Sequence, residues 1–70
     1  MAKTVAFENV VEFENVKATG ATKRAVLCEI DGEEHWIPRS QIDDDSEVYE
    51  KGHEGTLVIT EWLATQKGLI

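Results

Sequence analysis

Residues 24–38 decide the fold, and they read RAVLCEIDGEEHWIP. Two β-prone runs flank Asp31-Gly32, and an Asp-Gly pair in this position is a strong signal for a β-hairpin with a two-residue loop. Such a loop fixes the register of the two strands, so Leu27 is expected to face Trp36. One face of the hairpin then collects the side chains expected in the core, namely Val26, Cys28, Ile30, His35 and Ile37.

The sequence on either side of this hairpin predicts further elements. Pro38 has no N–H for a neighbouring strand, so its strand is expected to lie at a sheet edge or to end there. Residues 5–16, VAFENVVEFENV, contain a near-repeat whose alternation predicts a strand. Gly20 is expected to break this pattern. The core-facing side chains of the strand would be Val5, Phe7, Val11 and Phe13.

The second half of the chain predicts a polar connection, a strand and a short helix. Residues 39–55 are polar, and one helical turn capped by Asp45 or Ser46 is expected there. Residues 56–59, TLVI, predict a fourth strand. Thr60 is expected to cap a helix over residues 61–67 that Gly68 ends, with Trp62 and Leu63 on its buried side.

These elements predict one mainly β domain over residues 1–70. The expected fold class is a small, strongly bent antiparallel sheet, or an SH3-like or OB-like barrel of about four to five strands, with a short C-terminal helix. A core of this size is near the limit of independent stability, so we expect a homo-oligomer.

The charge and composition of the chain bear on its partners and its location. The chain has 70 residues with 7 Lys and Arg against 14 Asp and Glu, a formal net charge of −7. This charge opposes direct binding to duplex DNA, because the phosphate backbone would repel it. No apolar run approaches the ~20 residues of a membrane-spanning helix. One cysteine cannot form an internal disulfide and fits a reducing cytoplasm, so a cytoplasmic location is expected.

The sequence offers no convincing centre for metal or catalytic chemistry. His35, His53 and Cys28 are of the right types for zinc but lack ligand spacing. Cys28 lies in the middle of a strand, where burial lowers thiol reactivity. We therefore expect no catalytic residues, no metal and no cofactor, and the chain is not expected to be an enzyme.

Binding is the remaining class of function. Trp36 beside cations could stack on a nucleobase while basic and hydroxyl groups hold the phosphate. The same composition is typical of a protein-interaction hot spot, and a tryptophan of this kind can also be part of a second core. The expected ligand residues are Trp36, Arg39, Ser40, Lys23 and Arg24.

An acidic run provides an alternative surface. It could act as a nucleic-acid mimic or a protein inhibitor, although solvating residues have the same composition. Its expected partner-binding residues are Asp43, Asp44, Asp45 and Glu47.

Two stretches resemble a known group of sequences. Residues 25–42, ending in WIPRSQI, and residues 55–69, with GTLVI followed by EWLA, are similar to small proteins encoded by bacteriophages and prophages. The resemblance implies a non-enzymatic phage accessory module in the cytoplasm of the host cell. Such a module could bind a small nucleotide or a host or phage protein, possible roles being to counter a host defence or to assist single-stranded DNA binding or recombination.

Overall fold

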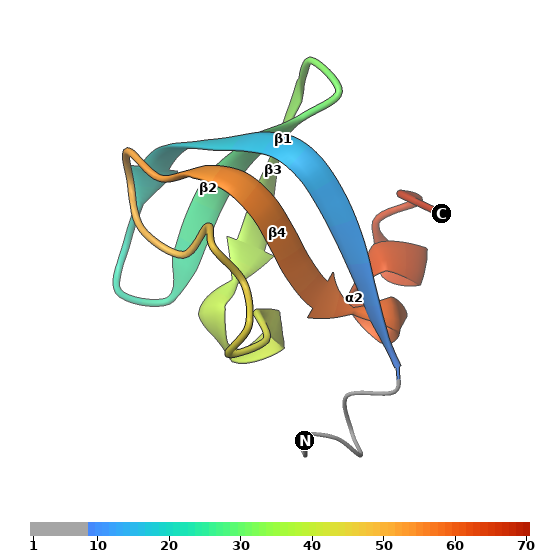
Figure 1. The fold of residues 1–70 in the computed structure, drawn as a ribbon. Coiled ribbons are helices and arrows are strands. Elements are labelled where there is room, and N and C mark those ends of the chain that lie inside the picture. The colour runs from blue at the N-terminus through green and yellow to red at the C-terminus, as the bar shows by residue number, and fades with distance from the viewer. Residues whose placement is uncertain (1–8) are drawn as a thin grey trace.

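The computed structural model describes residues 9–70 as a bent antiparallel sheet with a short C-terminal helix (Figure 1). Its strands lie in the order β3-β2-β1-β4. The expectation of a mainly β, strongly bent sheet is confirmed, and the sheet stays open rather than closing into a barrel. The elements are β1 (Val10–Ala21), β2 (Ala25–Ile30), β3 (Glu33–Pro38), a 3-10 helix (Arg39–Gln41), β4 (Glu54–Thr60) and α2 (Glu61–Gln66).

The β2–β3 hairpin has the register that its turn residues predict. Asp31 and Gly32 both have positive φ, 53° and 84°, as a two-residue hairpin turn of the I′ type requires. Leu27 faces Trp36 and Ala25 faces Pro38. β3 is an edge strand and ends at the proline, as expected. The predicted core face is also confirmed: four of its side chains are buried and the fifth, His35, is half-buried.

β1 is the longest strand, and it pairs with β4 along its first part and with β2 along its second. Its pairing with β4 shifts by one residue between Phe13 and Val16, where Asn15 has a φ of 60°. This bulge changes which alternate residues face inward. Phe13 packs against the core before it, and Val16 and Ala18 are buried after it.

Gly20 lies inside β1 and does not end it, so the expected break at this glycine is wrong. A second irregularity falls between Ala18 and Gly20 in the pairing with β2. A glycine in a strand often marks such a bulge, and the strand continues to Ala21. The predicted inward positions Val5 and Phe7 lie outside the described residues.

The outer edge of β4 is covered by residues 42–48. Ile42 forms a β-bridge with Ile59, and the N–H of Asp43 donates to the carbonyl of Val58 at 2.8 Å. The hydroxyl oxygen of Ser46 accepts a hydrogen bond from the N–H of Val58 at 3.1 Å. The expected helical turn capped by Asp45 or Ser46 is therefore wrong, because residues 42–48 form hydrogen bonds with the edge of β4 instead. The helical turn of the connection lies earlier, at residues 39–41.

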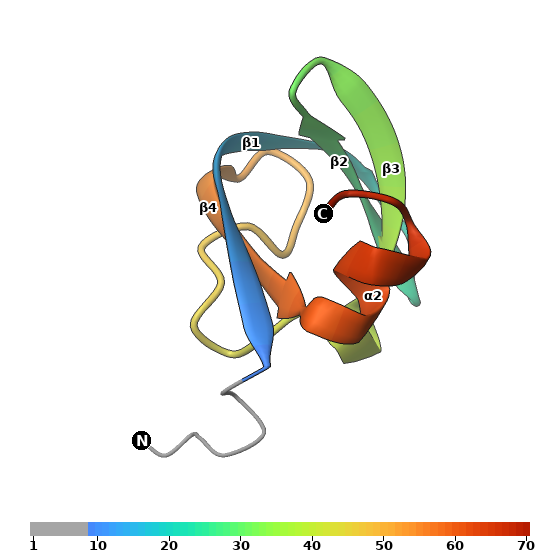
Figure 2. The same ribbon diagram turned by 90° about the vertical axis from the view of Figure 1, so that its right-hand side faces the viewer.

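α2 covers the open end of the bent sheet between β3 and β4 (Figure 2). The hydroxyl of Thr60 accepts from the N–H of Leu63 at 3.2 Å, which confirms the predicted N-cap. Gly68, with a φ of 71°, ends the helix as predicted. Leu63 and Ala64 are buried, whereas Trp62 is 62% exposed, so its expected place in the core is wrong. Successive helical residues are ~100° apart, and a stripe through Leu63 and Ala64 turns Trp62 outward.

The conformation of Asn15 leads to a test of stability. Asn tolerates the left-handed region, but a β-branched residue there is strained. We expect Asn15→Val to lower the free energy of unfolding by about 1–2 kcal/mol, and Asn15→Gly to leave it nearly unchanged. Urea denaturation of both variants and the wild type measures this. Equal losses in the two variants would show that the side chain of Asn15, and not its backbone, stabilises the bulge.

Candidate functional site

The convex side of the sheet carries a row of side chains that includes a partly exposed tryptophan. Gly20, Leu27 and Trp36 are neighbours across β1, β2 and β3. A Cβ on Gly20 would lie 3.5 Å from the Cβ of Leu27, an ordinary van der Waals contact, so Leu27 lies next to Gly20 on this side. Trp36 is 46% exposed. We call this row, with its acidic neighbours Glu29 and Glu34, the Trp36 face.

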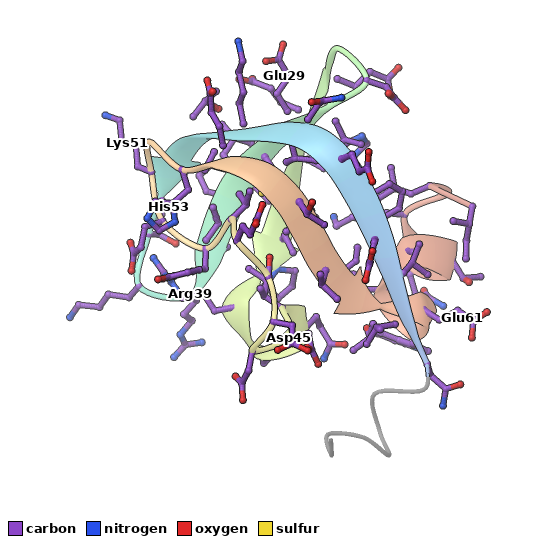
Figure 3. The ribbon with its side chains drawn as sticks, viewed as in Figure 1. Glu29, Arg39, Asp45, Lys51, His53 and Glu61 are labelled. Carbon is purple, nitrogen blue, oxygen red and sulfur yellow. The ribbon has the colours of Figure 1, made fainter. Side chains whose placement is uncertain are left out.

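The flank of the Trp36 face is polar and acidic. Glu29 and Glu34 are directly opposite each other across the hairpin, and Lys17 is opposite Glu29 on β1. The hydroxyl of Thr19 donates to Oε2 of Glu34 at 3.0 Å. Glu34 is exposed, and Glu29 lies near the turn end of the hairpin (Figure 3). The aromatic ring is thus bordered by two carboxylates at the strand end that leads to Asp31-Gly32.

Arg39 belongs to a different part of the molecule. Alternation along β3 turns Trp36 to the convex side, and Arg39 follows the core-side positions of that strand. Its Nε donates to the carbonyl of Thr22 at 3.0 Å, and its Nη1 donates to the carbonyl of Tyr49 at 2.9 Å. Nη1 and Nη2 also reach the carboxylate of Glu50 at 3.2 and 3.3 Å. Arg39 thus joins the β1–β2 turn to the segment before β4.

The segment that Arg39 holds is itself fixed to the sheet. The N–H of Gly52 donates to the carbonyl of Ala18, and the N–H of Ala18 donates to the carbonyl of His53, both at 2.9 Å. The rings of Tyr49 and His53 meet edge to face with their centroids 4.5 Å apart. Figure 3 shows Arg39 and His53 on the same side of the molecule, away from Glu61 on α2.

Two shallow hollows lie around the 3-10 helix, and Arg39 lines one of them. The larger, about 340 Å³, is lined by Arg39, Ile42, Asp43, Asp44 and Tyr49. The smaller, about 250 Å³, shares its acidic wall and adds Ser40, Gln41, Thr60 and Val10. The guanidinium at this place is already paired with Glu50. A phosphate entering either hollow would meet the carboxylates of Asp43 and Asp44, which oppose an anion.

The expected ligand residues therefore fall in three places. Trp36 lies on the convex face, while Arg39 and Ser40 line the hollows. Lys23 and Arg24 are exposed in the β1–β2 turn. That turn is held by Thr22, whose hydroxyl oxygen accepts from the N–H of Ala25 at 3.1 Å. Arg39 and Ser40 line adjacent but different hollows, and Trp36 lines neither of them.

The alternative acidic residues differ in their exposure and in the hydrogen bonds that their side chains accept. Glu47 accepts a hydrogen bond from the N–H of Thr56 at 2.9 Å, and its side chain lies where a Cβ on Gly55 would be. Oδ2 of Asp43 accepts from the N–H of Asp45 at 3.0 Å. Asp44 and Asp45 are exposed. Asp43 and Glu47 thus help to hold the cover of the β4 edge.

The described residues provide no cluster for metal chemistry. Across residues 9–70, no group of three or more His, Cys, Asp or Glu side chains is placed to hold a metal ion. In the same part of the chain, none of the helices has the length and apolar character needed to cross a membrane. Cys28 is fully buried, and desolvation raises the pKa of its thiol from 9.0 to about 11. A thiol of this kind is a poor nucleophile at neutral pH.

Comparisons of the chain with protein-family models, curated proteins and solved structures give no match. Function must therefore be argued from the geometry above. Sequence reasoning missed Tyr49 and Glu50 as partners of Arg39, because they are ten and more residues away and no local pattern links them. The role of Thr22 could have been found, since Ser and Thr side chains commonly bond the backbone of a turn.

Arg39 is expected to stabilise the fold. Arg39→Ala removes its hydrogen bonds to two other segments and should lower the free energy of unfolding by about 1–2 kcal/mol in urea denaturation. Arg39→Lys should recover only part of this, because an ammonium cannot make the forked contact with Glu50. Lys51→Ala, which removes an exposed cation from the same connection, is the control and should change little. A loss for Lys51→Ala equal to that for Arg39→Ala would assign the effect to net charge.

The thiol of Cys28 should make stability depend on alkaline pH. Below pH 9 the thiol is protonated in both folded and unfolded chains, so its contribution is fully present. Between pH 9 and about 11 the unfolded chain ionises first, and the free energy of unfolding falls. Cys28→Ala should show a shallower fall over this window in denaturation curves. Parallel curves for the variant and the wild type would contradict the raised pKa.

Proposed function

We propose that this chain is a non-enzymatic binding module that holds another protein on its Trp36 face. The observation that carries the proposal is the 46% exposure of Trp36 in a row with Leu27 on a regular sheet. Tryptophan is the residue type most enriched in interaction hot spots, because its large ring excludes water when a partner covers it. The resemblance to small phage proteins suggests a host or phage protein as the partner, including one that acts in host defence.

The charge of the module supports a basic partner surface. The net charge of −7 on 70 residues favours association with positive surfaces and speeds their encounter. Glu29 and Glu34 place part of this charge next to Trp36. A cation from the partner could therefore lie over the indole ring and contact a carboxylate at the same time.

A nucleotide ligand is less well supported by the same geometry. It would need Trp36 for the base and Arg39 with Ser40 for the phosphate, but these groups are on different parts of the surface. Four hydrogen bonds to Thr22, Tyr49 and Glu50 already occupy most guanidinium donors of Arg39. Asp43 and Asp44 line the hollow beside it. A phosphate would have to displace these contacts and overcome the carboxylates, which favours a protein over a nucleotide.

The two exposed tryptophans give a matched test of the proposal. Trp36→Ala removes the ring from the sheet face, and Trp62→Ala removes an exposed ring from α2. Affinity purification of the tagged chain from cells that express it, with quantitative mass spectrometry, compares both variants with the wild type. We expect a protein whose recovery falls about tenfold or more with Trp36→Ala and is unchanged with Trp62→Ala.

Two outcomes would contradict the proposal. One is the same set of recovered proteins for the wild type and Trp36→Ala. The other is a stoichiometric nucleotide in native mass spectra of the purified wild type, lost with Trp36→Ala. Thermal unfolding of both variants verifies that each remains folded.

A further inference from the structure

The two edges of the sheet differ in whether another segment of the chain pairs with them. The edge of β4 is covered by residues 42–48, which use backbone and Ser46 side-chain groups to pair with it. β3 forms the opposite edge, and within residues 9–70 no segment pairs with its outer side. An uncovered edge is a template for another strand, and proteins commonly blunt it when it serves no purpose.

The backbone groups that point out from this edge can be identified. The N–H of Arg39 donates to the carbonyl of Arg24 at 2.8 Å, so Arg39 is at a hydrogen-bonded position of the hairpin. Antiparallel pairs alternate, and Ile37, His35 and Glu33 share this pattern. The N–H and C=O groups of Glu34 and Trp36 therefore face away from β2. Pro38 has no N–H to offer, which limits an added strand to the part of β3 before it.

Charge indicates which kind of strand fits this edge. Residues 25–38 contain four acidic side chains and no Lys or Arg, the four being Glu29, Asp31, Glu33 and Glu34. A second copy of the chain would bring another acidic hairpin to the edge, and like charges on facing strands are destabilising. A strand with Lys or Arg at alternate positions would place these cations beside Glu34 and over the ring of Trp36.

Protection against edge-to-edge pairing does not by itself account for the residues on β3. Acidic residues and a proline are common devices against edge-to-edge pairing. However, such devices reduce exposed apolar area, whereas here a half-exposed tryptophan lies on the edge strand itself. The acidic residues disfavour pairing of β3 with another copy of this edge, and the tryptophan still offers binding energy to a partner of opposite charge.

We infer that the open edge of β3 takes up an extended, basic segment of the partner protein as an added strand. This inference rests on the proposed function and specifies how the Trp36 face recognises its partner. The backbone of Glu34 and Trp36 provides the hydrogen bonds, and the carboxylate of Glu34 and the indole ring provide the preference for cations.

The test separates the backbone of Glu34 from its charge. Glu34→Pro removes an outward N–H but leaves the hydrogen-bonded positions facing β2 intact. Glu34→Ala keeps the N–H and removes the carboxylate, together with the hydrogen bond that it accepts from Thr19. The probe is a display library of random peptides of about ten residues, selected against the full chain. We expect enriched peptides to be basic and to bind Glu34→Ala several-fold more weakly than the wild type. Binding to Glu34→Pro should be about tenfold weaker again, because a backbone hydrogen bond is lost.

Amide hydrogen exchange provides a second readout that does not depend on a variant. The amides of Glu34 and Trp36 should exchange rapidly in the free chain and slowly with an enriched peptide bound. Unchanged exchange at both amides would overturn strand addition even if Glu34→Pro is unstable.

The remaining outcomes separate this inference from the proposed function. Suppose that enriched peptides lose binding with Trp36→Ala but bind Glu34→Pro as tightly as Glu34→Ala. This result would support a protein-binding site at Trp36 and overturn strand addition. A wild-type dimer in analytical ultracentrifugation that Glu34→Pro converts to monomer would assign the edge to a second copy and overturn the inference. Enriched peptides with no basic residues would overturn the charge argument. A failure to enrich any peptide, with a cellular partner that still requires Trp36, would overturn the inference alone.

Discussion

The structure depends on the one-residue bulge in β1 at Asn15. A regular strand presents the same alternate positions to one side along its whole length. In β1, however, Phe13 packs against the core near β4, and Val16 and Ala18 are buried further along. The left-handed conformation of Asn15 inserts the extra residue that reconciles these two sets. Without it, one part of β1 would turn its apolar side chains outward. The bend of the sheet around a single core follows from the same irregularity, since bulges increase local twist and curvature.

Sequence reasoning was most accurate where structure is set locally. The Asp31-Gly32 turn, the register of the hairpin, the cap at Thr60 and the helix end at Gly68 each depend on residues within a few positions of one another. It was least accurate where distant segments compete. Ser46 was expected as a possible helix cap, but its hydroxyl oxygen instead accepts a hydrogen bond from the backbone N–H of Val58 on β4. Trp62 was misplaced because the buried stripe of α2 depends on how the helix meets the sheet.

In the candidate site, too, locally determined features could be predicted from the sequence and features set by distant segments could not. The pairing of Leu27 with Trp36 could be predicted from the turn, and so could the position of β3 at the edge. The separation of Trp36 from Arg39 could not, because it depends on Thr22, Tyr49 and Glu50 reaching Arg39 from two other segments. Trp36 and Arg39 are three residues apart in sequence, but they contact different parts of the molecule. Proximity in sequence suggested one ligand site, whereas the fold uses the guanidinium to join loops and leaves the indole ring on the surface.

The cover that residues 42–48 place over β4 has a consequence for stoichiometry. A sheet with two open edges can take a strand on each side, and each added molecule can recruit another, which leads to filaments without a defined length. Here the chain between the 3-10 helix and Val48 closes one side, so growth by strand pairing can proceed in one direction only. Within residues 9–70, each chain therefore has one sheet edge at which a strand can be added, so strand pairing cannot link these chains through both edges of the sheet.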